Sequence, residues 1–99
     1  MEILNFEFIA GQAPTKQVLV GCVGSGDLEI LMEPNTEGTV SIAVTTSVDG
    51  SAQRWKNIFE RMFAEQIPPA VHIDIHDFGA TPGVVRLRLE QAFEEVNRG

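Results

Sequence analysis

The chain has 99 residues, 43 % of them hydrophobic, and its 14 acidic and seven basic residues give a formal net charge of −7. This length predicts one domain over residues 1–99, and the apolar fraction is typical of a folded protein. The negative charge argues against nucleic acid and against anionic membranes as partners. The negative charge is equally consistent with docking onto basic proteins and with a role in solubility alone.

The apolar runs of the chain are short and are broken by Gly, Asp, Glu or Pro, so none is long enough to cross a bilayer. The N-terminal residues lack the basic and apolar regions of a signal peptide. Cys22 is the single cysteine, which excludes an internal disulfide and is typical of a reducing compartment. We therefore expect a cytoplasmic protein.

Four segments in the first half of the chain have the patterns of strands: residues 4–10, 17–23, 27–34 and 39–47. In the first, Leu4, Phe6 and Phe8 fall on one face, and polar residues fall on the other. The second is apolar throughout, which predicts a strand buried on both faces.

The pattern then changes to a helical period. Over residues 51–66 the apolar residues recur at intervals of three and four, which predicts an amphipathic helix with Ser51 as its N-cap. Alternation over residues 70–78 predicts a fifth strand. Thr81 and Pro82 then begin a helix, although the residues that follow also alternate like a strand. The order β-β-β-β-α-β-α predicts an α+β fold with two helices packed on a largely antiparallel sheet.

Ser25 lies between Gly24 and Gly26, where the second predicted strand ends and the third begins. Three interpretations are open: an ordinary turn, a phosphate-binding loop, and an exposed hydroxyl that another enzyme modifies. A phosphate-binding loop requires a helix after the glycines, whereas here a strand pattern follows. The spacing of a nucleophilic Gly-x-Ser-x-Gly turn is also absent. The residues favour a hairpin turn whose glycines leave the hydroxyl accessible.

Residues around this turn have alternative interpretations. Cys22 lies in an apolar stretch and is interpreted as a small buried residue rather than a reactive thiol. Asp27 and Glu29 either guide a modifying enzyme or are ordinary solvated carboxylates at a strand edge.

His72, Asp74 and His76 alternate along the fifth predicted strand and so share one face. Two histidines and a carboxylate could bind a metal ion. The sequence offers no fourth ligand, and a polar strand face opposite the apolar Val71 and Ile73 is the favoured interpretation.

Three stretches, "LVGCVGSGDLEILMEP", "TTSVDGSAQRW" and "PPAVHIDIHDFGATPGVVRLRLEQAFEE", resemble the acyl carrier protein (delta) subunit of bacterial malonate decarboxylase. The resemblance covers nearly the whole chain. It is most specific in the Gly-Ser-Gly-Asp-Leu-Glu loop and in the His-x-Asp-x-His-Asp-Phe-Gly-Ala-Thr-Pro-Gly segment. The acyl carrier subunit of citrate lyase is similar. Helical acyl carrier proteins have an Asp-Ser-Leu motif at a helix start, which this chain lacks.

The resemblance implies a non-catalytic carrier of acetyl and malonyl thioesters during decarboxylation of malonate to acetate and CO₂. It implies that Ser25 bears 2′-(5″-phosphoribosyl)-3′-dephospho-CoA through a phosphodiester, with Gly24, Gly26 and Asp27 around the attachment site. The implied partners are the acyl-transferase and decarboxylase subunits, malonyl transferase, and the phosphoribosyl-dephospho-CoA transferase that attaches the arm. The competing hypothesis is a small acidic adaptor that binds proteins without a cofactor.

Overall fold

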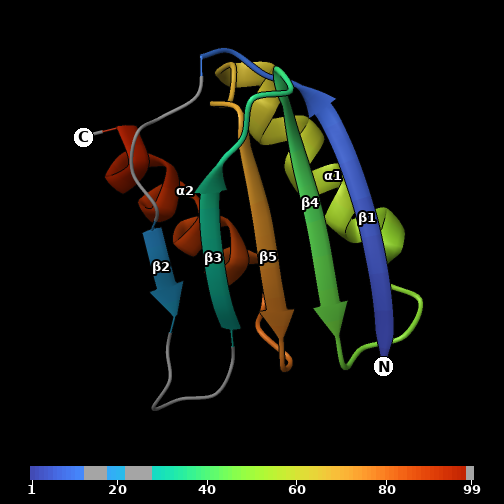
Figure 1. Ribbon diagram of the computed structural model, residues 1–99. Coiled ribbons are helices and arrows are strands. Elements are labelled where there is room, and N and C mark those ends of the chain that lie inside the picture. Colours follow the sequence, from blue (N-terminus) through green and yellow to red (C-terminus); the bar gives the residue numbers. More distant parts are fainter. Residues whose placement is uncertain (13–17, 22–27, 98–99) are drawn as a thin grey trace.

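The computed structural model describes residues 1–12, 18–21 and 28–97. Five strands and two helices follow one another in the predicted order (Figure 1). They are β1 (Glu2–Ile9), β2 (Val18–Gly21), β3 (Leu28–Pro34), β4 (Thr39–Thr46), α1 (Ala52–Glu65), β5 (Val71–Asp77) and α2 (Pro82–Asn97). Within these described ranges, neither helix has the length and apolar character needed to cross a membrane.

The strands form one sheet with the order β1-β4-β5-β3-β2, and β5 lies at its centre. Three of the neighbouring pairs are antiparallel. The pair β4 and β5 is parallel, because α1 returns the chain to the other end of the sheet between them. Both helices lie on the same face of the sheet (Figure 1). The predicted α+β fold with a largely antiparallel sheet is therefore confirmed.

The core lies between the sheet and the two helices. Alternate residues of β3, β4 and β5 point into it and are at most 2 % exposed: Leu28, Ile30, Met32, Val40, Ile42, Val44, Val71, Ile73 and Ile75. Leu4, Phe6 and Phe8 of β1 are partly buried against this core, as their spacing predicted. The alternation has a physical cause, since successive side chains of a strand point to opposite faces.

Strand β2 is at the edge of the sheet and pairs with β3 alone. The side chains of residues 18–21 lie outside what the structure describes, so the predicted burial of this strand on both faces stays a prediction.

Helix α1 packs on the sheet through the predicted apolar stripe. Trp55, Phe59 and Met62 are buried, and the Phe59 ring is stacked with its neighbours at centroid distances of 6.0 Å to Trp55 and 6.1 Å to Phe63. Ser51 is the N-cap residue, as predicted, but its side chain makes no capping hydrogen bond to the helix. Its hydroxyl donates instead to the Val48 carbonyl at 3.2 Å, within the turn before the helix.

Helix α2 begins at Pro82, as predicted, and the Thr81 hydroxyl accepts a hydrogen bond from the Val84 amide at 3.3 Å. The residues that also alternate like a strand are helical. The helical period extends further along the chain than the alternation, and it buries Leu89 and Val96 against the sheet.

Candidate functional site

The Gly-Ser-Gly stretch lies outside the described residues, so the positions of Cys22, Gly24, Ser25, Gly26 and Asp27 stay predictions. The strands on both sides are described. They are antiparallel neighbours in which Gly21 pairs with Glu29, which confirms the predicted pairing of the second and third strands. Leu28 begins β3 and pairs with Asp77, the last residue of the central strand. In the sequence, Ser25 is three residues before Leu28.

Several elements begin or end at this end of the sheet. Strands β4 and β5 are parallel and finish side by side, with Thr46 paired to Asp77. Each of these strands is followed within a few residues by a helix, α1 after β4 and α2 after β5. The N-termini of both helices therefore lie at the end of the molecule where β2 finishes and β3 starts (Figure 1).

A buried aspartate holds this end together. Asp77 is only 2 % exposed. Its Oδ1 accepts hydrogen bonds from the amides of Gly79 at 3.0 Å and Ala80 at 2.9 Å. Its Oδ2 accepts one from the Thr46 hydroxyl at 2.8 Å. That hydroxyl oxygen in turn accepts the Val48 amide at 3.0 Å. The turns after β4 and β5 are thus joined through one carboxylate.

Sequence reasoning missed this role of Asp77, although a signal was present. An aspartate two residues before a glycine at the end of a strand is typical of an Asx turn, in which the side chain binds nearby backbone amides. Gly79 has φ of 111°, a conformation that favours glycine. The residue between them, Phe78, is 60 % exposed. The turn therefore presents an aromatic ring to solvent beside the start of β3.

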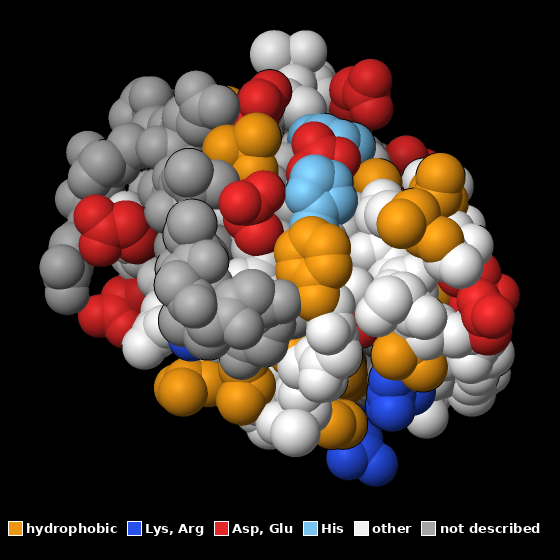
Figure 2. Space-filling model, turned by 90° about the horizontal axis from the view of Figure 1, so that it is seen from below, with side chains coloured by type: hydrophobic (Ala, Val, Ile, Leu, Met, Phe, Trp, Pro, Cys, Tyr) orange, Lys and Arg blue, Asp and Glu red, His pale blue; other side chains and the backbone are white. Residues whose placement is uncertain are grey.

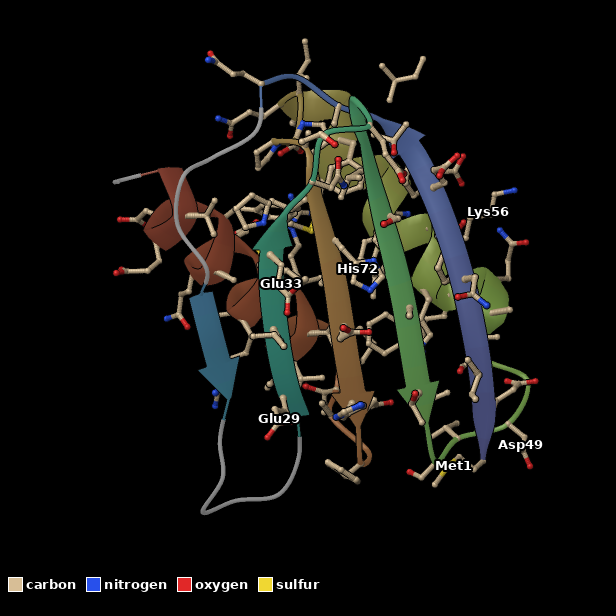
Figure 3. The ribbon with its side chains drawn as sticks, in the orientation of Figure 1. Met1, Glu29, Glu33, Asp49, Lys56 and His72 are labelled. Atoms are coloured by element: carbon tan, nitrogen blue, oxygen red, sulfur yellow. The ribbon has the colours of Figure 1, made fainter. Side chains whose placement is uncertain are left out.

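The predicted polar face of β5 lies on the side of the sheet that faces away from the helices (Figure 3). His72 Nδ1 lies 2.8 Å from the Ser41 hydroxyl oxygen, and His72 Nε2 lies 3.3 Å from Asp74 Oδ1. His76 Nδ1 lies 3.3 Å from Glu29 Oε1 on β3. Within the described ranges, no group of three or more His, Cys, Asp or Glu side chains is arranged to hold a metal ion. The burial of Ile73 and Ile75 confirms the predicted alternation, with the polar residues of β5 on the face opposite the core.

The described basic residues gather on the helices, whereas acidic residues lie on both faces of the molecule. Glu7, Glu29, Glu33 and Asp74 lie on the strands and on the face without helices. Every Lys and Arg in the described ranges lies on α1 or α2. Figure 2 views the end described above and shows the basic side chains on the side away from the two histidines. The Arg86 guanidinium donates to Glu90 at 2.9 Å and to Glu65 at 3.2 Å. The Glu90 hydrogen bond is the main reason that the pKa of Arg86 is raised.

The fold and these residues define a small α+β protein in which two paired strands frame a serine-containing connection. Residues 15–96 match the family model of the malonate decarboxylase delta subunit (MdcD), and the chain belongs to this family.

Relatives of nearly equal length support the assignment. The chain is 70 % identical over 96 residues to the malonate decarboxylase acyl carrier protein of Pseudomonas fluorescens (strain SBW25), covering 97 % of both chains. It is 66 % identical over 97 residues to that of Azotobacter vinelandii, covering 98 % of both. It is also similar to a chain in the crystal structure of a Pseudomonas malonate decarboxylase hetero-tetramer in complex with malonate. There the TM-score is 0.91 at 68 % identity, over 97 % of this chain and 99 % of that one.

Proposed function

We propose that this chain is the acyl carrier subunit of a malonate decarboxylase and that Ser25 carries its prosthetic arm. The observation that carries the proposal is the family match over residues 15–96, which includes the stretch from Gly24 to Asp27. The antiparallel pairing of β2 with β3 supports it, because it brings Gly21 and Leu28, the described residues on either side of 22–27, to the same end of the sheet.

The arm we propose is 2′-(5″-phosphoribosyl)-3′-dephospho-CoA, joined to the Ser25 hydroxyl oxygen by a phosphodiester. The described residues fit a phosphate-bearing group at this end. Helices α1 and α2 both begin here, and neither has an acidic residue in its first turn. The partial positive charge of a helix N-terminus therefore stays available to an anion.

When attached, the arm supplies a thiol that holds acetyl and malonyl groups as thioesters, in which the carbonyl can take up the charge left by departing CO₂. The chain itself contributes the attachment oxygen of Ser25 and the small residues Gly24 and Gly26 beside it. Tethering also raises the effective concentration of the acyl group at a partner's active site. We assign no catalytic residue to the chain.

The partners that we propose are the acyl-transferase and decarboxylase subunits, malonyl transferase and the transferase that attaches the arm. The hetero-tetramer of the Pseudomonas relative supports assembly with other subunits. We also propose a cytoplasmic location, for which the single cysteine is the support.

Intact-mass measurement on protein purified from its native host tests this function. We expect a mass increase equal to the phosphoribosyl-dephospho-CoA group, and peptide mapping should place it on the Ser25 peptide. Ser25→Ala, co-expressed with the arm-attaching transferase, should have the unmodified mass. Native protein without any added mass would favour the acidic adaptor, for which the carboxylates of the open face are the support.

A further inference from the structure

A groove between the two helices is lined by three of the seven basic residues of an acidic chain. It has a volume of about 680 Å³ and lies between the first halves of α1 and α2. Arg54 and Arg61 line it from α1, and Arg86, Leu87 and Gly83 line it from α2. The carboxylate in its lining is that of Glu90, which Arg86 already neutralises at 2.9 Å. The whole chain has a formal charge of −7, so this concentration of positive charge is local.

Two of the three arginines have no protein partner within the described ranges. Arg86 is held by Glu65 and Glu90, whereas neither Arg54 nor Arg61 makes an ion pair or side-chain hydrogen bond with a described residue. They are seven residues apart, so they lie on the same side of α1 and about 10 Å apart along its axis. This spacing suits a ligand that carries two separate anionic groups.

The rest of the lining suits a ligand that is partly apolar. Leu87 is 53 % exposed in the groove, and Ile58 is half-buried beside it. The N-terminal turn of α2 contributes Pro82 and Gly83, with no acidic residue to offset the positive end of the helix. Guanidinium groups bind phosphates by paired hydrogen bonds and stack on planar rings.

Pro82 and Gly83 in the groove lining form the first turn of α2, at the end of the sheet where β2 finishes and β3 starts. Both helices begin at that end, where Asp77 pairs with Leu28, and Leu28 follows the undescribed residues 22–27. We propose that this groove, lined by Arg54, Arg61 and Arg86, is a resting site for the phosphates of the coenzyme arm. The proposal depends on the proposed function, because it takes the arm to be attached at Ser25.

The chemical groups of the arm match the side chains that line the groove. Its phosphodiester and its diphosphate are two separate anionic groups, and its adenine is a planar ring. An arm that binds against the helices leaves the acidic sheet face free to contact basic surfaces of partner proteins. An arm held this way is released by any partner that binds its phosphates more strongly.

Titration of the isolated full-length chain with free 2′-(5″-phosphoribosyl)-3′-dephospho-CoA, which carries both anionic groups, tests the groove without the covalent bond. The chain is ¹⁵N-labelled and made without the arm-attaching transferase, and amide shifts are followed at low salt, where exposed charges are least screened. We expect shifts at Gly83 and at amides near Arg54 and Arg61, whereas adenosine, which lacks phosphate, should shift none of them.

Substituted variants test whether the arginines of the groove bind the ligand. Arg54→Ala combined with Arg61→Ala should raise the dissociation constant by about tenfold or more, because two charge-assisted contacts are lost. Lys56→Ala is the matched control, since Lys56 has the same charge on the same helix but lies on the β1 side (Figure 3). It should change affinity less than about twofold. Equal effects of the two variants on the dissociation constant, or amide shifts confined to residues of the sheet face, would contradict the proposed site. So would shifts at these amides with an acidic peptide but not with the free phosphoribosyl-dephospho-CoA, which would indicate a protein-docking surface.

A second measurement separates this proposal from the assignment of Ser25. Protein whose mass shows the adduct on Ser25 should have groove amides shifted from their positions in the unmodified chain. An adduct without such shifts overturns the groove and leaves the proposed function intact. Native protein without an adduct overturns the proposed function, and the free-ligand titration still decides whether the groove binds phosphates.

Discussion

Replacing Asp77 tests whether one carboxylate holds the end of the sheet at which Ser25 is expected. Asp77→Ala removes acceptors from the Thr46 hydroxyl and from the amides of Gly79 and Ala80. Hydrogen bonds to a charged group contribute about 1.5–3 kcal/mol each. Asp77 is 2 % exposed, so the free-energy cost of burying its charge offsets part of the stabilisation from these hydrogen bonds. We expect a net loss of about 3 kcal/mol of unfolding free energy, which lowers Tm by roughly 12–24 °C.

Urea unfolding of the unmodified chain provides the assay, because its single tryptophan, Trp55, is buried and reports loss of the core. Asp77→Asn is the matched control. Its amide oxygen can still accept the Gly79 and Ala80 amides, so it should cost only about 1 kcal/mol. If Asp77→Ala lowers the free energy of unfolding by less than about 1 kcal/mol with an unchanged m-value, this carboxylate does not hold the two turns together.

Four further outcomes are expected. Ser25→Ala should change stability by less than about 0.5 kcal/mol, measured by the same urea assay, but should abolish malonate turnover by the assembled complex. Cys22→Ala should keep both the arm, by peptide mapping, and most of the turnover; loss of the adduct in this variant would point to the thiol instead. Glu29→Lys should slow loading of the arm more at low salt than at high salt, and equal kinetics at every ionic strength would make Glu29 a solvated carboxylate only. Phe59→Ala should cost about 3–5 kcal/mol in urea unfolding, since its ring centroid lies 5.5–6.4 Å from four other aromatic rings; a smaller loss would mean that the core closes around the gap.

The elements of this fold could be predicted because each one is encoded locally. Alternation placed Leu4, Phe6 and Phe8 on one face of β1, and a helical period placed Trp55 and Phe59 on one face of α1. Strand order could not be predicted in the same way. That β5 lies between β4 and β3 depends on contacts between residues far apart in the chain, and these leave no short-range pattern.

The site was predicted less completely than the fold. Ser25 was singled out by its flanking glycines and by a family resemblance. The hydrogen bond from Thr46 to Asp77 was missed because it joins side chains of two strands that are 31 residues apart in the chain, and such a contact leaves no local pattern. Ser51 was correctly predicted as the N-cap residue, but the hydrogen bond that its hydroxyl donates to the Val48 carbonyl in the preceding turn was not predicted. The arginine groove needs two helices side by side, and no single helix shows it.

The central position of β5 has a consequence for how the chain acquires its structure during synthesis. The first four strands can form only two separate antiparallel pairs, β1 with β4 and β2 with β3, and nothing in the strand order joins these pairs until residues 71–77 are made. Isolated strand pairs are marginally stable in water. The ribosome must therefore release most of the chain before the sheet can close, and the serine-containing connection gains its final surroundings among the last steps of folding. Any shortened version that keeps Ser25 but ends before β5 loses the partner of Leu28, and we expect it to be unfolded and a poor substrate for an enzyme that recognises the folded protein.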